Sequence, residues 1–424
     1  MNLEIRQALQ DWNPWATGPF PTELLGLKRE YDLTPYLVVP EIKIIEGARR
    51  VGKSTLLYEV IRQVLTTSEK VLYINFEDEV LKNYTLSAIV YEHLEHAEID
   101  YLFVDEIQSC SEWVQFIRKA YDRREFKQIW VSGSNASLIK EEYATLLTGR
   151  NLPIHIFPLS FREFLGFKGV AITAAPLPKR QQAKVIGLFA EYMEYGAFPA
   201  VVIRTAFKKE ILLSYFEDFI YKDIVVRHKI NASKIRELAI YLATNSAKLF
   251  SYRKIAAALH CHLDTVLDYF SYLTEAFLFE EVYKYDPSLQ KQLSNERKVY
   301  CLDTGLAASV SFRFSDDKGR MLENLVYCEL RRRKQEIYYH KHLLECDFVI
   351  KEELQITQAI QVCLTLQDAN TRERELAGLL EAMQRYKLTT GLILTYDQES
   401  VETVIHNGAT YIIQIMSAWK WLQT

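Results

Sequence analysis

The sequence predicts an α/β fold in which a parallel sheet covered by helices is followed by a helical middle and a smaller α/β unit. Up to residue 157, short apolar runs rich in β-branched and aromatic residues alternate with stretches of helical spacing. That alternation is typical of a parallel sheet with helical crossovers. Past residue 296, predicted strands and helices alternate again, which indicates a second α/β unit.

The elements follow in chain order. The first sheet takes its strands from 42–45, 71–76, 101–104, 128–131 and 153–157, with a helix beginning near Lys53. The segment TAAPLPKRQQ, around 173–182, has the proline and polar content of a linker. Several helices are predicted between 215 and 279. They include a helix-turn-helix in which Ser251 caps the first helix and Asp264 or Thr265 the second.

The carboxy-terminal unit is predicted from the same periodicities. A short apolar run at 299–302 precedes it. Its helices fall at 321–333 and 371–386, and its strands at 337–340, 346–350, 359–364, 391–396 and 411–415.

Composition and charge limit the possible functions of the protein. A chain of 424 residues with 49% hydrophobic and 25% charged residues is typical of a globular protein of two to four domains. A net charge of −4 argues against a globally basic nucleic-acid binder. The six cysteines lie far apart, which favours reduced thiols over disulfides or a zinc site. Without a signal-peptide pattern or a long apolar run, we expect a cytoplasmic protein that does not enter a membrane.

The stretch GARRVGKST matches the pattern GxxxxGK[ST] between an apolar strand and a helix. In that context backbone N–H groups and the helix N-terminus surround phosphate oxygens. Lys53 is expected to reach the β and γ phosphates, and Ser54 to bind Mg²⁺ through its hydroxyl. The predicted nucleotide-binding residues of this loop are Gly47, Ala48, Arg49, Arg50, Val51, Gly52, Lys53, Ser54 and Thr55.

The stretch IDYLFVDEIQ supplies an acidic pair at the end of another buried strand. Asp105 is expected to hold Mg²⁺, and Glu106 to polarise a water molecule for attack on the γ phosphate. The cofactors predicted from these two motifs are therefore ATP and Mg²⁺, and the predicted activity is ATP hydrolysis.

Two further polar candidates lie beyond this pair. The run Ser132-Gly-Ser-Asn135 ends the next strand, where Asn135 or Ser134 is predicted to orient the lytic water unless the run is only a turn. Arg150 directly precedes the fifth strand. It either reaches a neighbouring subunit's nucleotide, which would need a homo-oligomer, or pairs with a carboxylate of its own chain.

The chain resembles a prokaryotic family of AAA-type ATPases whose carboxy-terminal domain is related to PD-(D/E)xK nucleases. The resemblance is carried by these motifs in this order: WNPW, GARRVGKST, YINFEDE, FVDEIQ, VSGSNASL, LLTGR, FPLSFREF, YGAFPAVV, VYCLDTGLAA, LENLVYCELRRR and ECDFVI. It implies a P-loop sheet of order 5-1-4-3-2. It also implies four parts: an ATPase domain at 1–165, a helical lid at 166–230, a winged-helix-like domain at 231–295 and a nuclease-like domain at 296–424.

The nuclease-like end departs from an active pattern. Metal-dependent cutting of this type needs carboxylates for a divalent ion and a lysine beside them. The resemblance places Glu323 and Asp347 at two of the carboxylate positions. Gln361 stands where a third is expected and Cys363 where the lysine should be, so we interpret the site as vestigial. Lys351 is the remaining candidate for a lysine that acts from another strand.

The predicted recognition helix carries Asp264, Asp268 and Glu275, which phosphates would repel. Interdomain packing or a partner contact is therefore preferred to major-groove binding. The cluster Arg331–Lys334 is interpreted first as cations completing a helix end.

The leading functional hypothesis is a nucleotide-dependent switch or remodeller of a nucleic-acid or protein partner. The alternatives are a scaffold with structural ATP and an ATP-gated nuclease.

Overall fold

The computed structural model describes residues 3–134, 146–170, 178–311 and 317–424. The chain divides into two compact units, which are described separately. Unit 1 comprises Met1–Phe157 with Glu275–Phe277, and unit 2 comprises Pro158–Thr274 with Leu278–Thr424.

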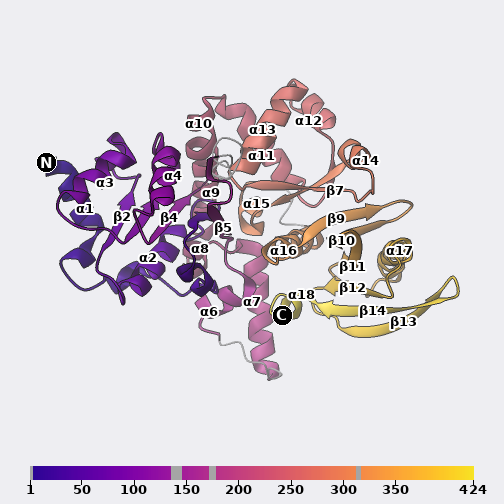
Figure 1. Cartoon of the computed structure of the whole chain (residues 1–424). Coiled ribbons are helices and arrows are strands. Elements are labelled where there is room, and N and C mark those ends of the chain that lie inside the picture. The colour runs from indigo at the N-terminus through magenta and orange to yellow at the C-terminus, as the bar shows by residue number, and fades with distance from the viewer. Residues whose placement is uncertain (1–2, 135–145, 171–177, 312–316) are drawn as a thin grey trace. The chain divides into compact units, whose positions relative to one another are not determined.

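Unit 1 is built on a five-stranded parallel sheet (Figure 1). Its strands, all of them buried over most of their length except β5, are β1 (Ile42–Glu46), β2 (Val71–Asn75), β3 (Tyr101–Asp105), β4 (Gln128–Gly133) and β5 (Asn151–His155). The order is β2-β3-β4-β1-β5, which is the predicted order read from the other edge. Because β1 and β3 are separated only by β4, the residues that follow β1 and β3 meet at one edge of the sheet.

Helices complete unit 1. They are α1 (Leu3–Trp12), α2 (Lys53–Val64), α3 (Leu86–Leu94) and α4 (Trp113–Arg123). Apolar residues of these helices and of the strands form one buried cluster. That cluster fixes α2, whose first turn follows the glycine-rich loop.

The amino-terminal segment closes an open edge of this sheet. Strand β2 lies at the edge, so part of its backbone lacks a neighbouring strand. Asn13 pairs with it instead. Its amide nitrogen donates to the Tyr73 carbonyl at 2.8 Å, and its amide oxygen accepts from the Tyr73 N–H at 2.7 Å. The side chains of Trp12 and Trp15 pack against the Tyr73 ring. The segment WNPW therefore covers the edge strand β2.

The fifth strand begins two residues earlier than predicted. The prediction of 153–157 followed the apolar run, but pairing with β1 already starts at Asn151. At the other end the Phe157 N–H donates to the Tyr31 hydroxyl at 3.1 Å rather than to a strand. A side chain outside the sheet therefore sets this boundary.

Unit 2 begins with a helical region. Its helices are α6 (Phe161–Phe167), α7 (Lys179–Tyr195), α8 (Pro199–Ile203), α9 (Lys208–Asp218), the π-helix η7 (Phe219–Val225), α10 (Val226–His228), α11 (Ala232–Thr244), α12 (Tyr252–Ala258), α13 (Leu263–Glu275), α14 (Leu289–Ser294) and α15 (Thr304–Val310). Residues 179–182 of the predicted linker belong to helix α7.

A three-stranded antiparallel sheet follows these helices, in the order β6-β8-β7. Its strands are β6 (Leu249–Phe250), β7 (Phe279–Tyr283) and β8 (Arg297–Cys301). Strand β8 lies beyond the predicted boundary at 295/296, yet it pairs with β6 and β7. The winged-helix assignment stays a prediction.

The predicted caps of the helix-turn-helix are wrong in part. Ser251 does precede α12, but its side chain makes no capping hydrogen bond. The second helix starts at Leu263, because the carbonyl of His262 already accepts the first helical bond, from the Val266 N–H at 3.2 Å. Asp264 and Thr265 therefore lie inside the first turn, where they cannot act as the N-cap residue.

The motifs YGAFPAVV and VYCLDTGLAA of unit 2 are in close contact, and we call this contact the crowded junction. Asp303 accepts hydrogen bonds from the Ala197 N–H at 2.7 Å and from the Leu306 N–H at 2.8 Å, so it caps α15 and holds the residue after Gly196. A Cβ on Gly196 would lie 1.9 Å from Asp303 Oδ1, and one on Gly305 would lie 2.1 Å from the Tyr195 carbonyl carbon. Both glycines are required by close approach.

The carboxy-terminal part of unit 2 is a six-stranded mixed sheet of order β13-β14-β12-β11-β10-β9 (Figure 1). Its strands are β9 (Glu336–Lys341), β10 (Glu345–Glu352), β11 (Gln355–Val362), β12 (Thr390–Thr395), β13 (Ser400–His406) and β14 (Ala409–Ser417). The helices α16 (Lys318–Arg332), α17 (Ala369–Tyr386) and α18 (Ala418–Trp421) complete it. Apolar residues of α17 and of the central strands form the core of this part.

Strand β13 was not predicted. Its exposed Val401 and Ile405 break the pattern of a half-buried strand. The signal was nevertheless present, because Asn407 and Gly408 both have positive φ and join β13 to β14 in a two-residue turn.

Replacing Gly305 with alanine is expected to destabilise unit 2 by about 1–3 kcal/mol, the usual cost of overpacking. A lowered midpoint of thermal unfolding would be the measurement. Gly187→Ala is the matched control, because a Cβ at that position of α7 meets nothing within 4 Å. The control is expected to gain up to about 1 kcal/mol from helix propensity. Equal effects of both variants would contradict the crowded junction.

Candidate functional site

The glycine-rich loop after β1 has the backbone shape of an anion cradle. Gly47 and Gly52 have φ of 150° and 100°, and Arg50 between them has φ of 70°. A Cβ on Gly47 would lie 2.2 Å from the Ile156 carbonyl oxygen, so only glycine fits there. The loop leads into the 12-residue helix α2. Its backbone N–H groups and the positive end of the helix dipole therefore favour a phosphate.

Lys53 lies within this cradle. Its Nζ donates to the carbonyls of Gly47 at 3.2 Å and Ala48 at 3.1 Å, and the residue is buried. These carbonyls are neutral partners of a charged group. A phosphate oxygen is a stronger partner for an ammonium, so the loop can exchange these contacts for a ligand.

Asp105, at the end of β3, is the most buried acid of unit 1 that the structure describes. Tyr73 donates to Oδ2 at 2.8 Å and Ser132 donates to Oδ1, and the Ser54 side chain lies near enough to lower the pKa of Asp105. Burial, followed by the nearby Glu106, raises the pKa of Asp105 above its usual value. A cation at this position would favour the ionised carboxylate.

Ser54 follows Lys53 in the first turn of α2, so its position beside Asp105 brings the two predicted motifs together. The arrangement of hydroxyl and carboxylate oxygens suits Mg²⁺, which prefers oxygen ligands. The residues thus fit a nucleotide with its metal ion.

Glu106 follows Asp105 in a left-handed conformation, with φ of 51°. The side-chain nitrogen of Gln108 donates to Glu106 Oε2 and also to the Ser134 hydroxyl at 3.1 Å. Gln108 therefore joins the ends of β3 and β4. Its Oε1 is buried and has no hydrogen-bond partner among the described residues. Asn135 lies outside the described residues.

Three supporting residues were missed by sequence reasoning. Tyr73 and Gln108 occur inside quoted motifs, but their apolar or turn-like context gave no sign of their contacts. Arg29 lies in the amino-terminal extension. Its guanidinium donates to the Val51 carbonyl at 2.6 Å and to the Phe157 carbonyl at 2.9 Å. Arg29 therefore links the glycine-rich loop to the segment after β5.

The other residues of this loop that were predicted to bind nucleotide differ in burial and in contacts. Ala48 and Val51 are buried, and Arg49 forms an ion pair of 2.6 Å with Glu77 from YINFEDE. Thr55 lies in the first turn of α2.

Arg150 is placed apart from this cluster in its own chain. Its backbone carbonyl accepts from the Ile42 N–H at 2.8 Å, so it lies where β1 begins rather than where β1 ends. The glycine-rich loop is a strand length away, about 13 Å. The Arg150 guanidinium pairs with Asp122 at 2.8 Å, which is one of its two predicted roles.

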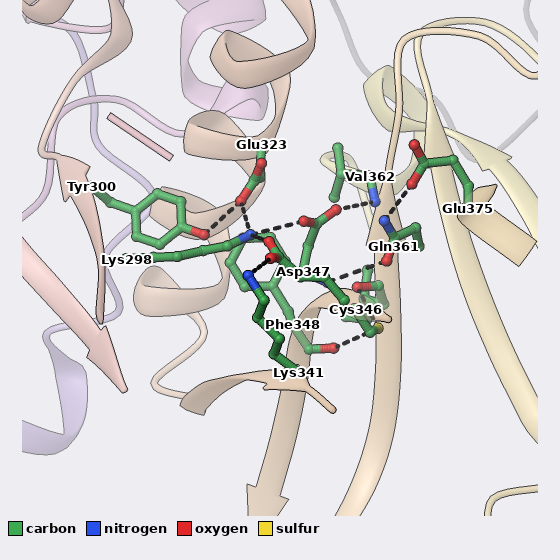
Figure 2. A network of polar contacts seen from close by, with 12 residues as sticks. Lys298, Tyr300, Glu323, Lys341, Cys346, Asp347, Phe348, Gln361, Val362 and Glu375 are labelled. Carbon is green, nitrogen blue, oxygen red and sulfur yellow. Dashed lines mark hydrogen bonds and ion pairs between the residues drawn. The ribbon is translucent and has the colours of Figure 1, made fainter. Parts of the chain in front are cut away.

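A second cluster of predicted site residues lies in unit 2 (Figure 2). Glu323 from α16 and Asp347 from β10 both contact the ammonium of Lys298, at 2.8 and 2.9 Å. Gln361 lies beside them, because its side-chain oxygen accepts from the Asp347 N–H at 3.2 Å. Cys363 belongs to the apolar core, where burial raises the pKa of its thiol to about 12. Lys351 is engaged with Glu336 at 2.9 Å.

The basic cluster in and after α16 makes structural contacts. Arg331 pairs with Glu280 at 2.6 Å, Arg332 donates to the Pro158 carbonyl at 2.9 Å, and Arg333 donates to the Trp421 carbonyl at 2.8 Å. These contacts favour a role in packing over a phosphate track. Among the described residues, no helix is both long and apolar enough to cross a membrane.

Comparisons with known proteins agree with this geometry. Residues 39–165 match the family described as AAA domain, and residues 186–317 match a domain of unknown function (DUF8612). The uncharacterized protein MJ1544 of Methanocaldococcus jannaschii is 33% identical over 93% of this chain and 90% of its own. An uncharacterized protein of Haemophilus influenzae is 32% identical over 86% of this chain and 92% of its own.

A solved structure of RuvB from Thermotoga maritima is 15% identical and covers 57% of this chain and 82% of its own. Its TM-score is 0.29, and at that score the likeness carries no weight.

Replacing Tyr73 with phenylalanine is expected to weaken Mg²⁺ binding to the nucleotide-loaded protein by about 10-fold, as losses of outer-shell partners do. The reason is that Asp105 loses the hydroxyl that orients it. A Mg²⁺ titration of nucleotide binding measures the effect. Tyr101→Phe, at the opposite end of β3, is the control and should leave the titration unchanged. An unaltered Mg²⁺ dependence in Tyr73→Phe would remove Tyr73 from the site.

Proposed function

The chain belongs to the family of the uncharacterized protein MJ1544 of Methanocaldococcus jannaschii, and we propose that its AAA domain binds and hydrolyses ATP in the presence of Mg²⁺. One observation carries the proposal. The hydroxyl of Ser54 meets the buried carboxylate of Asp105 beside a loop that already holds an ammonium.

Binding of the triphosphate uses groups that are already positioned. The N–H groups of the loop and of the first turn of α2 receive phosphate oxygens. Lys53 leaves the carbonyls of Gly47 and Ala48 for the β and γ phosphates. Arg29 keeps the loop in place through the Val51 carbonyl.

Hydrolysis places different demands on the acidic pair. Ser54 and Asp105 would hold Mg²⁺, which would supply positive charge against the phosphate oxygens. A Glu106 carboxylate oxygen takes a proton from water as the new bond to the γ phosphorus forms. The bond from that phosphorus to the bridging oxygen breaks, and ADP and phosphate leave. Gln108 fixes the orientation of Glu106 through its donated hydrogen bond.

The wider role that we propose is a nucleotide-dependent switch or remodeller of a nucleic-acid or protein partner. Nucleotide can act as a switch only if it binds two arrangements of the protein with different affinity. Arg150 lies too far from the loop of its own chain to serve that site, so a catalytic role for it requires a homo-oligomer.

Glu106→Gln is expected to keep ATP binding and to lose turnover on the order of 10²- to 10⁴-fold, the usual worth of a general base. Binding of labelled ATP and release of phosphate are measured on the same preparation. Glu23→Gln, an exposed position, is the control. Unchanged phosphate release would instead support a scaffold in which ATP is a structural ligand.

Lys53→Ala is expected to lower ATP affinity and turnover together, because the ammonium contacts phosphate both before and during the reaction. Lys119→Ala, exposed on α4, should behave like the parent. Full hydrolysis by Lys53→Ala would overturn the assignment of the loop.

A further inference from the structure

Lys298 is a lysine buried inside unit 2. It lies on β8, and only 2% of its side chain is exposed. Its ammonium sits between Glu323 on one side and Asp347 on the other, as Figure 2 shows. Burying an ammonium is costly unless it is paired, so the partners of this group decide its state.

The hydrogen-bonding capacity of Lys298 is filled. An ammonium has three N–H donors. Nζ lies 2.8 Å from Glu323 Oε1, 2.9 Å from Asp347 Oδ1 and 2.9 Å from Glu345 Oε1. With three carboxylate partners there is no donor left for a water molecule or a substrate phosphate. The group is thus unsuited to assist an attacking water.

Electrostatics keeps Lys298 charged. Burial acts to lower the pKa of Lys298, but Asp347 and Glu323 outweigh it and raise that pKa well above its ordinary value. The contacts with these two carboxylates thus favour the charged ammonium over the neutral amine.

Glu323 and Asp347 each accept a further hydrogen bond. Glu323 Oε1 accepts from the Tyr300 hydroxyl at 2.7 Å, and Asp347 Oδ2 accepts from the Val362 N–H at 3.0 Å. The side chain of Gln361 is held at both ends, by the Asp347 N–H and by Glu375. The neutral oxygen that Gln361 could offer a metal ion is already in use.

The resemblance to metal-dependent nucleases implies a divalent ion at Glu323 and Asp347, and these residues do not fit one. An ion bound to the same oxygens would have to lie beside the positive charge of Nζ, and Coulomb repulsion opposes that. We propose that the ammonium of Lys298 is the resident cation of this carboxylate cluster and stands in the place of a divalent metal ion.

In this proposal the cluster has a structural role. Lys298 comes from the three-stranded sheet, Asp347 from the six-stranded sheet and Glu323 from α16. The ion pairs therefore fasten these three elements to one another. This inference does not depend on ATP hydrolysis, because every residue that it uses lies in unit 2.

Mn²⁺ binding to nucleotide-free protein tests the proposal, with electron paramagnetic resonance counting the bound ions. The parent is expected to bind no Mn²⁺ that depends on Asp347. Lys298→Ala removes the cation that three carboxylates share and is expected to gain one Mn²⁺ site. Asp347→Asn in the Lys298→Ala background should abolish that gain, which separates it from ions bound at other acids such as Glu92 and Glu95.

Lys341→Ala is the matched control, since Lys341 lines a pocket together with Glu323 and Asp347 and pairs with Glu345 at 3.4 Å. It should gain no Mn²⁺ site. Thermal unfolding supplies a second readout. Lys298→Ala should lose roughly 10 °C in Tm, the scale of breaking a buried ion pair, and Mn²⁺ should restore part of that loss.

Several outcomes would overturn the proposal. One is Mn²⁺ binding by the parent that disappears in Asp347→Asn. Another is metal-dependent cutting of DNA or RNA by the parent that requires Asp347, which would make Lys298 a catalytic lysine instead. A third is a folded Lys298→Ala with no new Mn²⁺ site. If Lys298→Ala does not fold, Mn²⁺ binding by Lys298→Met and by the parent tests the proposal instead.

Discussion

A buried carboxylate must have a positive or hydrogen-donating partner, and this requirement governs the acids around Asp105 in unit 1 and around Asp347 in unit 2. Asp105 in unit 1 is surrounded by the hydroxyls of Tyr73, Ser132 and Ser54. Hydroxyls stabilise the carboxylate without neutralising it, and burial still raises its pKa. The site therefore retains a demand for a cation, which is the property that a metal-nucleotide site needs.

Glu323 and Asp347 in unit 2 satisfy the same requirement from within the chain. Their counter-charge is the Lys298 ammonium, which is bound covalently to β8 and cannot be exchanged. The Asp105 carboxylate thus has hydroxyl partners, whereas Glu323 and Asp347 have an ammonium from their own chain. The acid with hydroxyl partners belongs to the candidate catalytic site. In our proposal, the acids with an ammonium partner hold parts of unit 2 together.

The sequence predicted best what depends on local pattern. Strands β1 to β4 were located because long apolar runs in a parallel sheet are buried on both faces, and the resemblance supplied the sheet order that the structure confirms. Strand β13 was missed because exposed Val401 and Ile405 obscure its alternation, although Asn407-Gly408 is a recognisable hairpin turn. The cap of α13 was misplaced because Asp264 and Thr265 suit either a cap or a first turn.

The contacts that define the sites were harder to predict, because they join residues far apart in the chain. Lys298 lies 25 residues from Glu323 and 49 from Asp347. A single lysine next to a short apolar run is usually an exposed residue. Tyr73 and Arg29 were missed for the same reason, since their partners lie on neighbouring strands or on the loop that they support. Position in the sheet, rather than local sequence, creates these interactions.

The most direct measurement is a crystal structure of the protein with Mn²⁺ and a non-hydrolysable ATP analogue, in which anomalous scattering locates the metal. The account predicts a manganese peak between Ser54, Asp105 and the nucleotide, and none between Glu323 and Asp347. A peak at the second position, or an empty first position with the analogue bound elsewhere, would contradict it.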